Sequence, residues 1–87
     1  MGWTIEILDR ALIQIGELDK ISQQRIFKFL QRLPSYPSPR AIGEALAGPL
    51  SGLWKYRVGD YRLICEIADR RLVVVVAKIG HRREVYR

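Results

Sequence analysis

Cationic side chains that can bind a phosphate gather at two places in the second half of the chain. The first group is Lys55, Arg57 and Arg62, and the second is the C-terminal stretch Gly80–Arg87. This stretch holds the only histidine, His81, together with Arg82, Arg83, Tyr86 and Arg87. Arginine binds phosphate through paired hydrogen bonds and stabilises a pentavalent transition state, and tyrosine can stack on a base. These residue types indicate a phosphodiester ligand.

Cleavage of RNA without a metal ion requires a general base for the 2′-hydroxyl and a general acid for the leaving 5′-oxygen. Lys55 is a candidate base, because the positive charges of Arg57 and Arg62 favour its neutral form. His81 is a candidate acid or base, or a residue that only binds. Carboxylates do not occur at metal-binding spacing, so no cofactor is expected. The RNA-binding residues expected are Arg62, Arg83 and Arg87.

The composition favours an acidic partner. The 87 residues are expected to form a single domain, 1–87, and their net charge of +6 points to nucleic acid first. Cys65, the lone cysteine, lies in a strand-like alternation and is expected to be a buried core residue in a reducing cytoplasm. Because no apolar run approaches the roughly 20 residues that span a bilayer, a soluble cytoplasmic protein without a membrane segment is expected.

The first half of the chain predicts a strand and a helical hairpin. Apolar and polar residues alternate over 3–8, which predicts a short strand. Asp9 is expected to cap a first helix, and Asp19 or Ser22 a second helix that stops at Pro34. Arg25, Lys28 and Arg32 could form a basic ridge on this second helix, although a charged helix face is usually only solvated. After a proline-rich loop, residues 41–47 are expected to form one or two helical turns.

The second half predicts three strands, over 53–58, 61–67 and 72–79. Gly59-Asp60 is a two-residue hairpin turn that would place Arg57 directly opposite Arg62. Such a like-charged pair costs stability, so we interpret the cluster with Lys55 as an anion site. A second two-residue turn at Asp69-Arg70 would pair Arg62 with Ala77, and would place Ala77 and Ile79 on this cationic face, from which the tail departs.

These elements predict an α/β (α+β) fold. A short N-terminal strand precedes an αα-hairpin, and a three-strand antiparallel meander follows. The strands are expected to form one sheet with the helices on one face. The almost wholly apolar strand over 72–79 is expected to be central in that sheet, because both of its faces must be covered.

Two blocks of this sequence resemble the RelE branch of the RelE/ParE toxin superfamily. One is residues 46–63, LAGPLSGLWKYRVGDYRL, and the other is residues 79–86, IGHRREVY. The order of elements also matches, so the resemblance covers essentially the whole chain. It implies a toxin of a type II toxin–antitoxin pair that enters the ribosomal A site and cuts mRNA without a metal ion. In that route the 2′-hydroxyl attacks the phosphate and leaves a 2′,3′-cyclic phosphate.

The resemblance also implies partners and residue roles. A RelB-like antitoxin would wrap the toxin, and only their complex would bind operator DNA. By position, Lys55 and Arg57 match the basic pair that supplies the general base, and Arg62 matches the phosphate-binding arginine. Arg82 matches the arginine that stabilises the transition state or protonates the leaving group, and Tyr86 the tyrosine that stacks on or orients the substrate.

The sequence leaves alternatives for the general base, for the general acid and for the class of function. Arg57 stands where well-described members have a lysine, and arginine is a poor proton acceptor, so the base is Lys55 or His81. Related toxins with a histidine in the tail use it as the general acid, so His81 also competes with Arg82. Finally, a ParE-like toxin that inhibits DNA gyrase without catalysis, or a nucleic-acid-binding co-repressor module, would share the fold, although neither requires this set of site residues.

Overall fold

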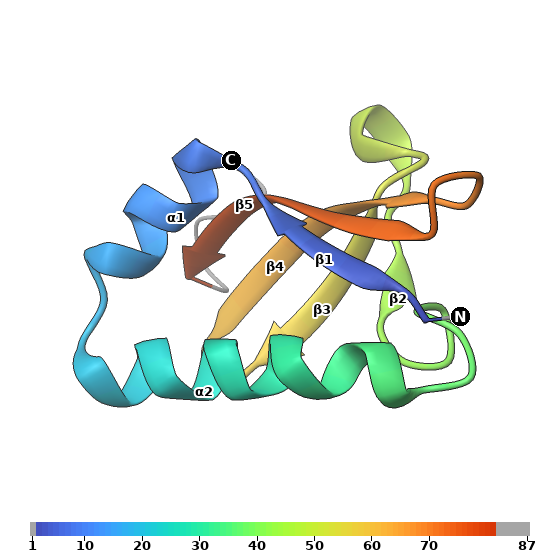
Figure 1. Cartoon of the computed structure of the whole chain (residues 1–87). Helices are drawn as coiled ribbons and strands as arrows, with labels where there is room; N and C mark the ends of the chain where they lie inside the picture. The colour runs from blue at the N-terminus through green and yellow to red at the C-terminus, as the bar shows by residue number, and fades with distance from the viewer. Residues whose placement is uncertain (1, 82–87) are drawn as a thin grey trace.

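The structure, a computed structural model, describes residues 2–81. Its elements are β1 (Thr4–Ile7), α1 (Asp9–Gly16), α2 (Lys20–Arg32), β2 (Glu44–Ala45), β3 (Trp54–Val58), β4 (Tyr61–Ala68) and β5 (Val73–His81), with short 3-10 turns at Leu33–Ser35 and Gly48–Leu50. The five strands form one sheet in the order β1-β5-β4-β3-β2, in which β1 runs parallel to β5 and the other neighbours are antiparallel (Figure 1). Strand β5 is therefore interior, as its apolar sequence predicts.

Both helices pack on the same face of the sheet, which we call the helix face. The core that joins them to the strands comprises Ala11, Ile15, Ile26, Leu30, Leu33, Tyr56, Leu63, Cys65, Val74, Val76 and Ile79. Helix α1 lies beside β5 and α2 crosses near β3 (Figure 1). The α+β architecture expected from the sequence is confirmed, and a fifth, two-residue strand β2 is added at the edge.

The helix boundaries follow the expected caps with one shift. The Asp19 side chain accepts a hydrogen bond from the Ser22 backbone N–H, 3.1 Å away, and so caps α2 as expected. Asp9, in contrast, is the first residue of α1 rather than its cap, and Leu8 occupies the cap position without a side-chain hydrogen bond. Asp9 still lies in the first turn, where a negative charge is favourable to the helix dipole. Neither described helix is long and apolar enough to cross a bilayer.

The hairpin of β3 and β4 has the predicted register. Arg57 pairs with Arg62, Val58 with Tyr61, and Tyr56 with Leu63, across a turn in which Gly59 takes a φ of 60°. Paired residues of antiparallel strands point to the same side, so Arg57 and Arg62 lie together on the face opposite the helices. We call this the second face.

The predicted register of β4 with β5 is wrong. The turn spans four residues, 69–72, rather than two, with Leu72 at a φ of 55°, and a β-bulge lies next to Ile64. The longer turn moves the pairing by two residues, which leaves every side chain on its expected face. The bulge moves it by one more, which reverses the faces beyond it. Arg62 therefore pairs with Gly80 instead of Ala77, and Ile79 lies in the core.

The predicted helical turns over residues 41–47 are also wrong. This segment is extended, and β2 pairs with β3, with Glu44 opposite Lys55 and Ala45 opposite Trp54. Two aromatic side chains of β3 hold it there. The Trp54 indole N–H donates to the carbonyl of Ile42 at 2.9 Å, and the buried Tyr56 hydroxyl donates to the carbonyl of Pro39. These long-range bonds override the weak local helix preference.

Candidate functional site

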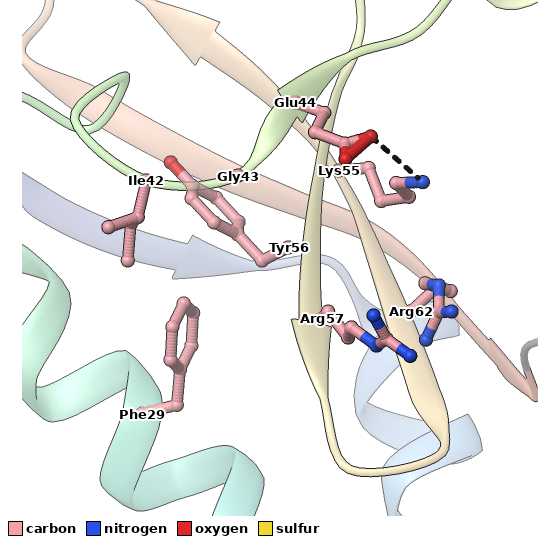
Figure 2. A pocket seen from close by; sticks show the side chains of 8 residues that line it. All are labelled: Phe29, Ile42, Gly43, Glu44, Lys55, Tyr56, Arg57 and Arg62. Atoms are coloured by element: carbon pink, nitrogen blue, oxygen red, sulfur yellow. Dashed lines mark ion pairs between the residues drawn. The ribbon is translucent and has the colours of Figure 1, made fainter.

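A pocket of about 270 Å³ lies beside the edge of β3, and we call it the central pocket. It is lined by Phe29, Ile42, Gly43, Glu44, Lys55, Tyr56, Arg57 and Arg62 (Figure 2). Because β2 pairs with only two residues of β3, the edge of β3 beyond Lys55 is uncovered, and the pocket reaches both sides of the strand. The expected cationic group of Lys55, Arg57 and Arg62 is thus brought into one pocket.

The two arginines of this pocket carry uncompensated charge. Their side chains project from neighbouring strands on the same side of the hairpin (Figure 2). Within residues 2–81, neither forms a salt bridge. The guanidinium of Arg62 donates a long hydrogen bond, 3.5 Å, to the carbonyl of Tyr61. Two unpaired guanidinium groups on adjacent strands are arranged to hold one phosphate between them.

Glu44 is a site residue that the sequence did not suggest. Its carboxylate lies 3.4 Å from Lys55 Nζ, and the two side chains differ in exposure, 71% for Glu44 and 21% for Lys55 (Figure 2). The pocket therefore contains a carboxylate acceptor beside an ammonium donor. Glu44 would have been found from the pairing of β2 with β3. The sequence analysis predicted helical turns over residues 41–47 and therefore no such pairing.

Gly43 makes the approach of Glu44 to Lys55 possible. It has a φ of +84°, and a Cβ at this position would lie 2.5 Å from both the carbonyl oxygen of Lys55 and the indole nitrogen of Trp54. Only glycine fits there without moving β3 or the loop. The segment is also held from outside, since Arg40 donates two hydrogen bonds, of 2.7 and 2.9 Å, to the carboxylate of Asp69.

The β-bulge adds a fourth cation to the second face. Lys78 pairs with Ile64, which in turn pairs with Lys55 on its other side. The second face therefore carries one row of Lys55, Ile64 and Lys78, and a second row of Arg57, Arg62 and Gly80. Gly80 has no side chain and so leaves space beside the Arg62 guanidinium. The predicted partner of Arg62 was Ala77, which is also a small residue.

His81 lies on the opposite side of β5 from this cluster. It pairs with Tyr61, the two rings meet edge to face with centroids 5.8 Å apart, and both line a hollow of about 390 Å³ against α1. The carboxamide oxygen of Gln14 in α1 accepts the Ile79 backbone N–H at 2.7 Å and fixes this end of β5. The structure thus does not bring His81 together with Arg57 and Arg62.

The other predicted tail residues lie outside the described part of the chain. These are Arg82, Arg83, Tyr86 and Arg87. Within the described part, two buried groups are removed from proton transfer. Burial raises the pKa of the Cys65 thiol to about 12, as fits its predicted core position, and burial also raises the pKa of the Tyr56 hydroxyl. Among the described residues that line the central pocket, Glu44 supplies a carboxylate and Lys55 an amine.

Comparison with known proteins agrees with this architecture. The family model described as ParE toxin of the type II toxin–antitoxin system parDE matches residues 5–86. A curated protein, Toxin RelG of Mycobacterium tuberculosis (strain ATCC 25618 / H37Rv), is 37% identical over 49 residues. That match covers 56% of this chain and 56% of the relative, so a little over half of its length is matched.

Solved structures of RelE toxins share the fold. A chain of the RelBE2 toxin–antitoxin complex of Mycobacterium tuberculosis superimposes with a TM-score of 0.84 at 24% identity, over 93% of this chain and 99% of that one. A chain of the archaeal RelE–RelB complex from Pyrococcus horikoshii OT3 gives 0.75 at 26% identity, over 98% and 100%. The resemblance expected from the two sequence blocks is confirmed. With a family match over nearly its whole length, this chain belongs to the ParE toxin family of type II toxin–antitoxin systems, within the RelE/ParE superfamily.

Proposed function

We propose that this chain is a toxin that enters the ribosomal A site and cuts mRNA there as a metal-independent endoribonuclease. The observation that carries the proposal is the central pocket, in which the guanidinium groups of Arg57 and Arg62, which form no salt bridge within residues 2–81, lie beside the Lys55–Glu44 ion pair. The guanidinium groups supply the binding of a phosphodiester, and the ion pair supplies a proton acceptor. The 2′-hydroxyl next to that phosphate would be the nucleophile, leaving a 2′,3′-cyclic phosphate and a 5′-hydroxyl.

The ion pair changes which residue we assign as general base. A carboxylate can accept a proton and an ammonium group can only donate one, so we assign the proton of the 2′-hydroxyl to Glu44, whose carboxylate lies 3.4 Å from Lys55 Nζ. Lys55 then keeps its charge and stabilises the oxyanion that forms, together with Arg57 and Arg62. Arg57 cannot be the base at neutral pH, because arginine does not give up its proton there.

The leaving 5′-oxygen needs a proton, and the tail provides the candidates. By resemblance we assign this step to Arg82, with Tyr86 stacking on or orienting the substrate, and RNA contacts to Arg83 and Arg87. His81 is the competing acid. To reach the central pocket its ring would have to leave the contact with Tyr61 on the helix side of β5.

The partners we propose follow from the relatives. The solved complexes named above pair a RelE toxin with a RelB antitoxin. We propose that this chain forms a pair of the same kind. A RelB-like antitoxin would cover the cationic pocket and silence the toxin in the cytoplasm, and operator DNA would bind only the complex. The ribosome would position the mRNA that a small, open pocket cannot orient by itself.

The test is to translate an mRNA on purified ribosomes with added protein, and then to map the 5′ ends of the RNA by primer extension. Codon-positioned cuts are expected, and Arg62→Ala should remove them because the phosphate loses its ligand. Glu44→Gln should slow cutting at least 100-fold, within the range of general-base catalysis. Lys55→Met should also slow it, whereas cutting at the normal rate by Glu44→Gln would return the base role to Lys55 or His81.

A second candidate is inhibition of DNA gyrase without catalysis, favoured by the family model, which is that of a ParE toxin. It predicts blocked supercoiling by purified gyrase and uncut mRNA on ribosomes. Binding to nucleic acid with neither effect would favour the co-repressor module instead.

A further inference from the structure

A second hollow adjoins the central pocket on the side of α2. This groove, of about 610 Å³, lies between α2 and the uncovered edge of β3, and we call it the α2–β3 groove. Arg25, Lys28 and Arg32 line it from the helix, and Arg57 lines it from the strand. Arg57 and Phe29 line both hollows, so the groove and the central pocket meet at these two side chains.

The positive charge of this groove is not neutralised by any ion pair among residues 2–81. Helix α2 has no Asp or Glu from Lys20 to Arg32. In the part of the chain that the structure describes, no salt bridge involves Arg25, Lys28 or Arg32. Three other cations of the described residues do form ion pairs, Arg40 with Asp69, Lys55 with Glu44 and Arg71 with Glu6. Acids three or four residues from these cations would stabilise the helix, and α2 has none from Lys20 to Arg32.

The spacing of these cations forms a line that leads to the phosphate site. Arg25, Lys28 and Arg32 are three and four residues apart, so they lie on one side of α2 over about 10 Å of helix axis. That length matches about three nucleotides of a stacked strand at roughly 3.4 Å each. At the other end, Arg25 Nη1 lies 3.6 Å from the position of a Cβ on Gly59, at the turn that joins Arg57 to Arg62.

The floor of the groove is apolar. Phe29 and Val58 are half-buried between the cations, and the ring of Phe29 packs against Tyr56 with centroids 5.3 Å apart. A line of cations beside an aromatic surface is the arrangement that binds single-stranded nucleic acid, with phosphates on the cations and a base or ribose on the ring.

We infer that the α2–β3 groove binds the sugar–phosphate backbone of an RNA segment that continues from the segment held in the central pocket. The inference rests on the proposed function in that the strand in the central pocket is RNA. Arg25, Lys28 and Arg32 take about three phosphates beyond the cleavage site, and Arg57 is shared between the two sites. The groove thereby extends the RNA contact from one scissile phosphate to a short strand.

The test measures binding rather than cleavage, so it does not depend on catalysis. Two fluorescein-labelled, uncleavable 2′-O-methyl oligoribonucleotides are titrated by fluorescence anisotropy, one about 12 nucleotides long and one of about three. The variant is Arg25→Gln/Lys28→Gln/Arg32→Gln. The matched control removes the same charge from three exposed cations that line neither hollow, as Arg10→Gln/Lys20→Gln/Arg70→Gln.

The groove variant should bind the long RNA roughly 100-fold more weakly at about 0.1 M salt, with a salt slope smaller by about 2, because three phosphate contacts at about 0.7 each are lost. The short RNA is too short to occupy the central pocket and the groove together, so its affinity should fall much less than that of the long RNA. The control's affinity for the long RNA should change by less than about threefold. Circular dichroism checks folding, and three single variants replace the triple one if it unfolds. Equal loss in the control, or unchanged long-RNA binding with weakened antitoxin binding, would overturn the inference. Absence of mRNA cutting alone would count against the proposed function and leave this result intact.

Discussion

The pairing of Arg57 with Arg62 should make the wild-type protein less stable than its charge-deleted variants. Directly opposed residues have Cβ atoms about 5 Å apart, and splayed guanidinium groups would lie about 7 Å apart. Coulomb repulsion at that separation is about 0.6 kcal/mol at the dielectric constant of water and about 1.2 kcal/mol at half that value. Arg57→Gln and Arg62→Gln are therefore each expected to raise the free energy of unfolding by about 0.5–1 kcal/mol at low salt.

A double-mutant cycle by urea unfolding isolates this repulsion from the loss of packing by the arginine stems. Because either single substitution removes the pair, the double variant should be no more stable than the single ones. Raising the ionic strength from about 0.01 M to about 1 M shortens the Debye length from about 30 Å to about 3 Å, so most of the coupling energy should vanish. Arg70→Gln, an exposed cation in the β4–β5 turn, is the control and should show no such coupling with Arg62→Gln.

Two results would contradict a repulsion between Arg57 and Arg62. One is a coupling energy of zero or of the opposite sign at low salt, and the other is a coupling that does not respond to salt. If the repulsion is measured as expected, the two arginines are held together against the stability of the fold. Bound sulfate or phosphate should then raise the melting temperature of the wild type more than that of Arg57→Gln, because the anion relieves the repulsion.

Three further outcomes are expected. Gly43→Ala should reduce mRNA cleavage at least tenfold while the far-ultraviolet circular dichroism persists, because a side chain there strains the backbone by about 1–2 kcal/mol and pushes β2 from β3; normal cleavage would show that β2 is not needed. Gln14→Ala should lower the free energy of unfolding by about 1–3 kcal/mol, since the Ile79 N–H loses its acceptor, and Gln14→Glu should restore most of it in denaturant titrations. Asp69→Asn should lower the melting temperature at neutral pH. The Arg40 guanidinium holds the pKa of Asp69 below its usual value, so the stability that this ion pair contributes is complete above about pH 4 and is lost as the pH falls through the lowered pKa. A difference in melting temperature between wild type and Asp69→Asn that persisted below that pKa would contradict the assignment to this ion pair.

Local patterns were sufficient where a short-range rule applies. The Gly59-Asp60 turn has two residues, and a two-residue hairpin loop determines the register of its strands, so the pairing of Arg57 with Arg62 was predicted correctly. Asp19 caps α2 for the same reason, because the cap contacts the N–H of a residue only three positions away.

The errors arose where distant parts of the chain meet. Nothing local distinguishes a bulge at Ala77 from regular pairing, yet that one extra residue in β5 moves Ile79 into the core and Lys78 onto the second face. Residues 41–47 read as weakly helical, but hydrogen bonds from Trp54 and Tyr56 hold the segment extended. Because this extended segment was not predicted, the carboxylate of Glu44 in the central pocket was not predicted either.

Short-range sequence patterns were enough to identify the class of this protein. The order of its elements agrees with the structure, and the two family-like blocks agree with the family match. The composition of the site depends on tertiary structure. The tertiary structure placed Glu44 beside Lys55, added Lys78, turned His81 toward α1 and joined the central pocket to α2. These placements depend on strand pairing and helix packing between residues far apart in the chain, which side-chain alternation along one segment does not encode.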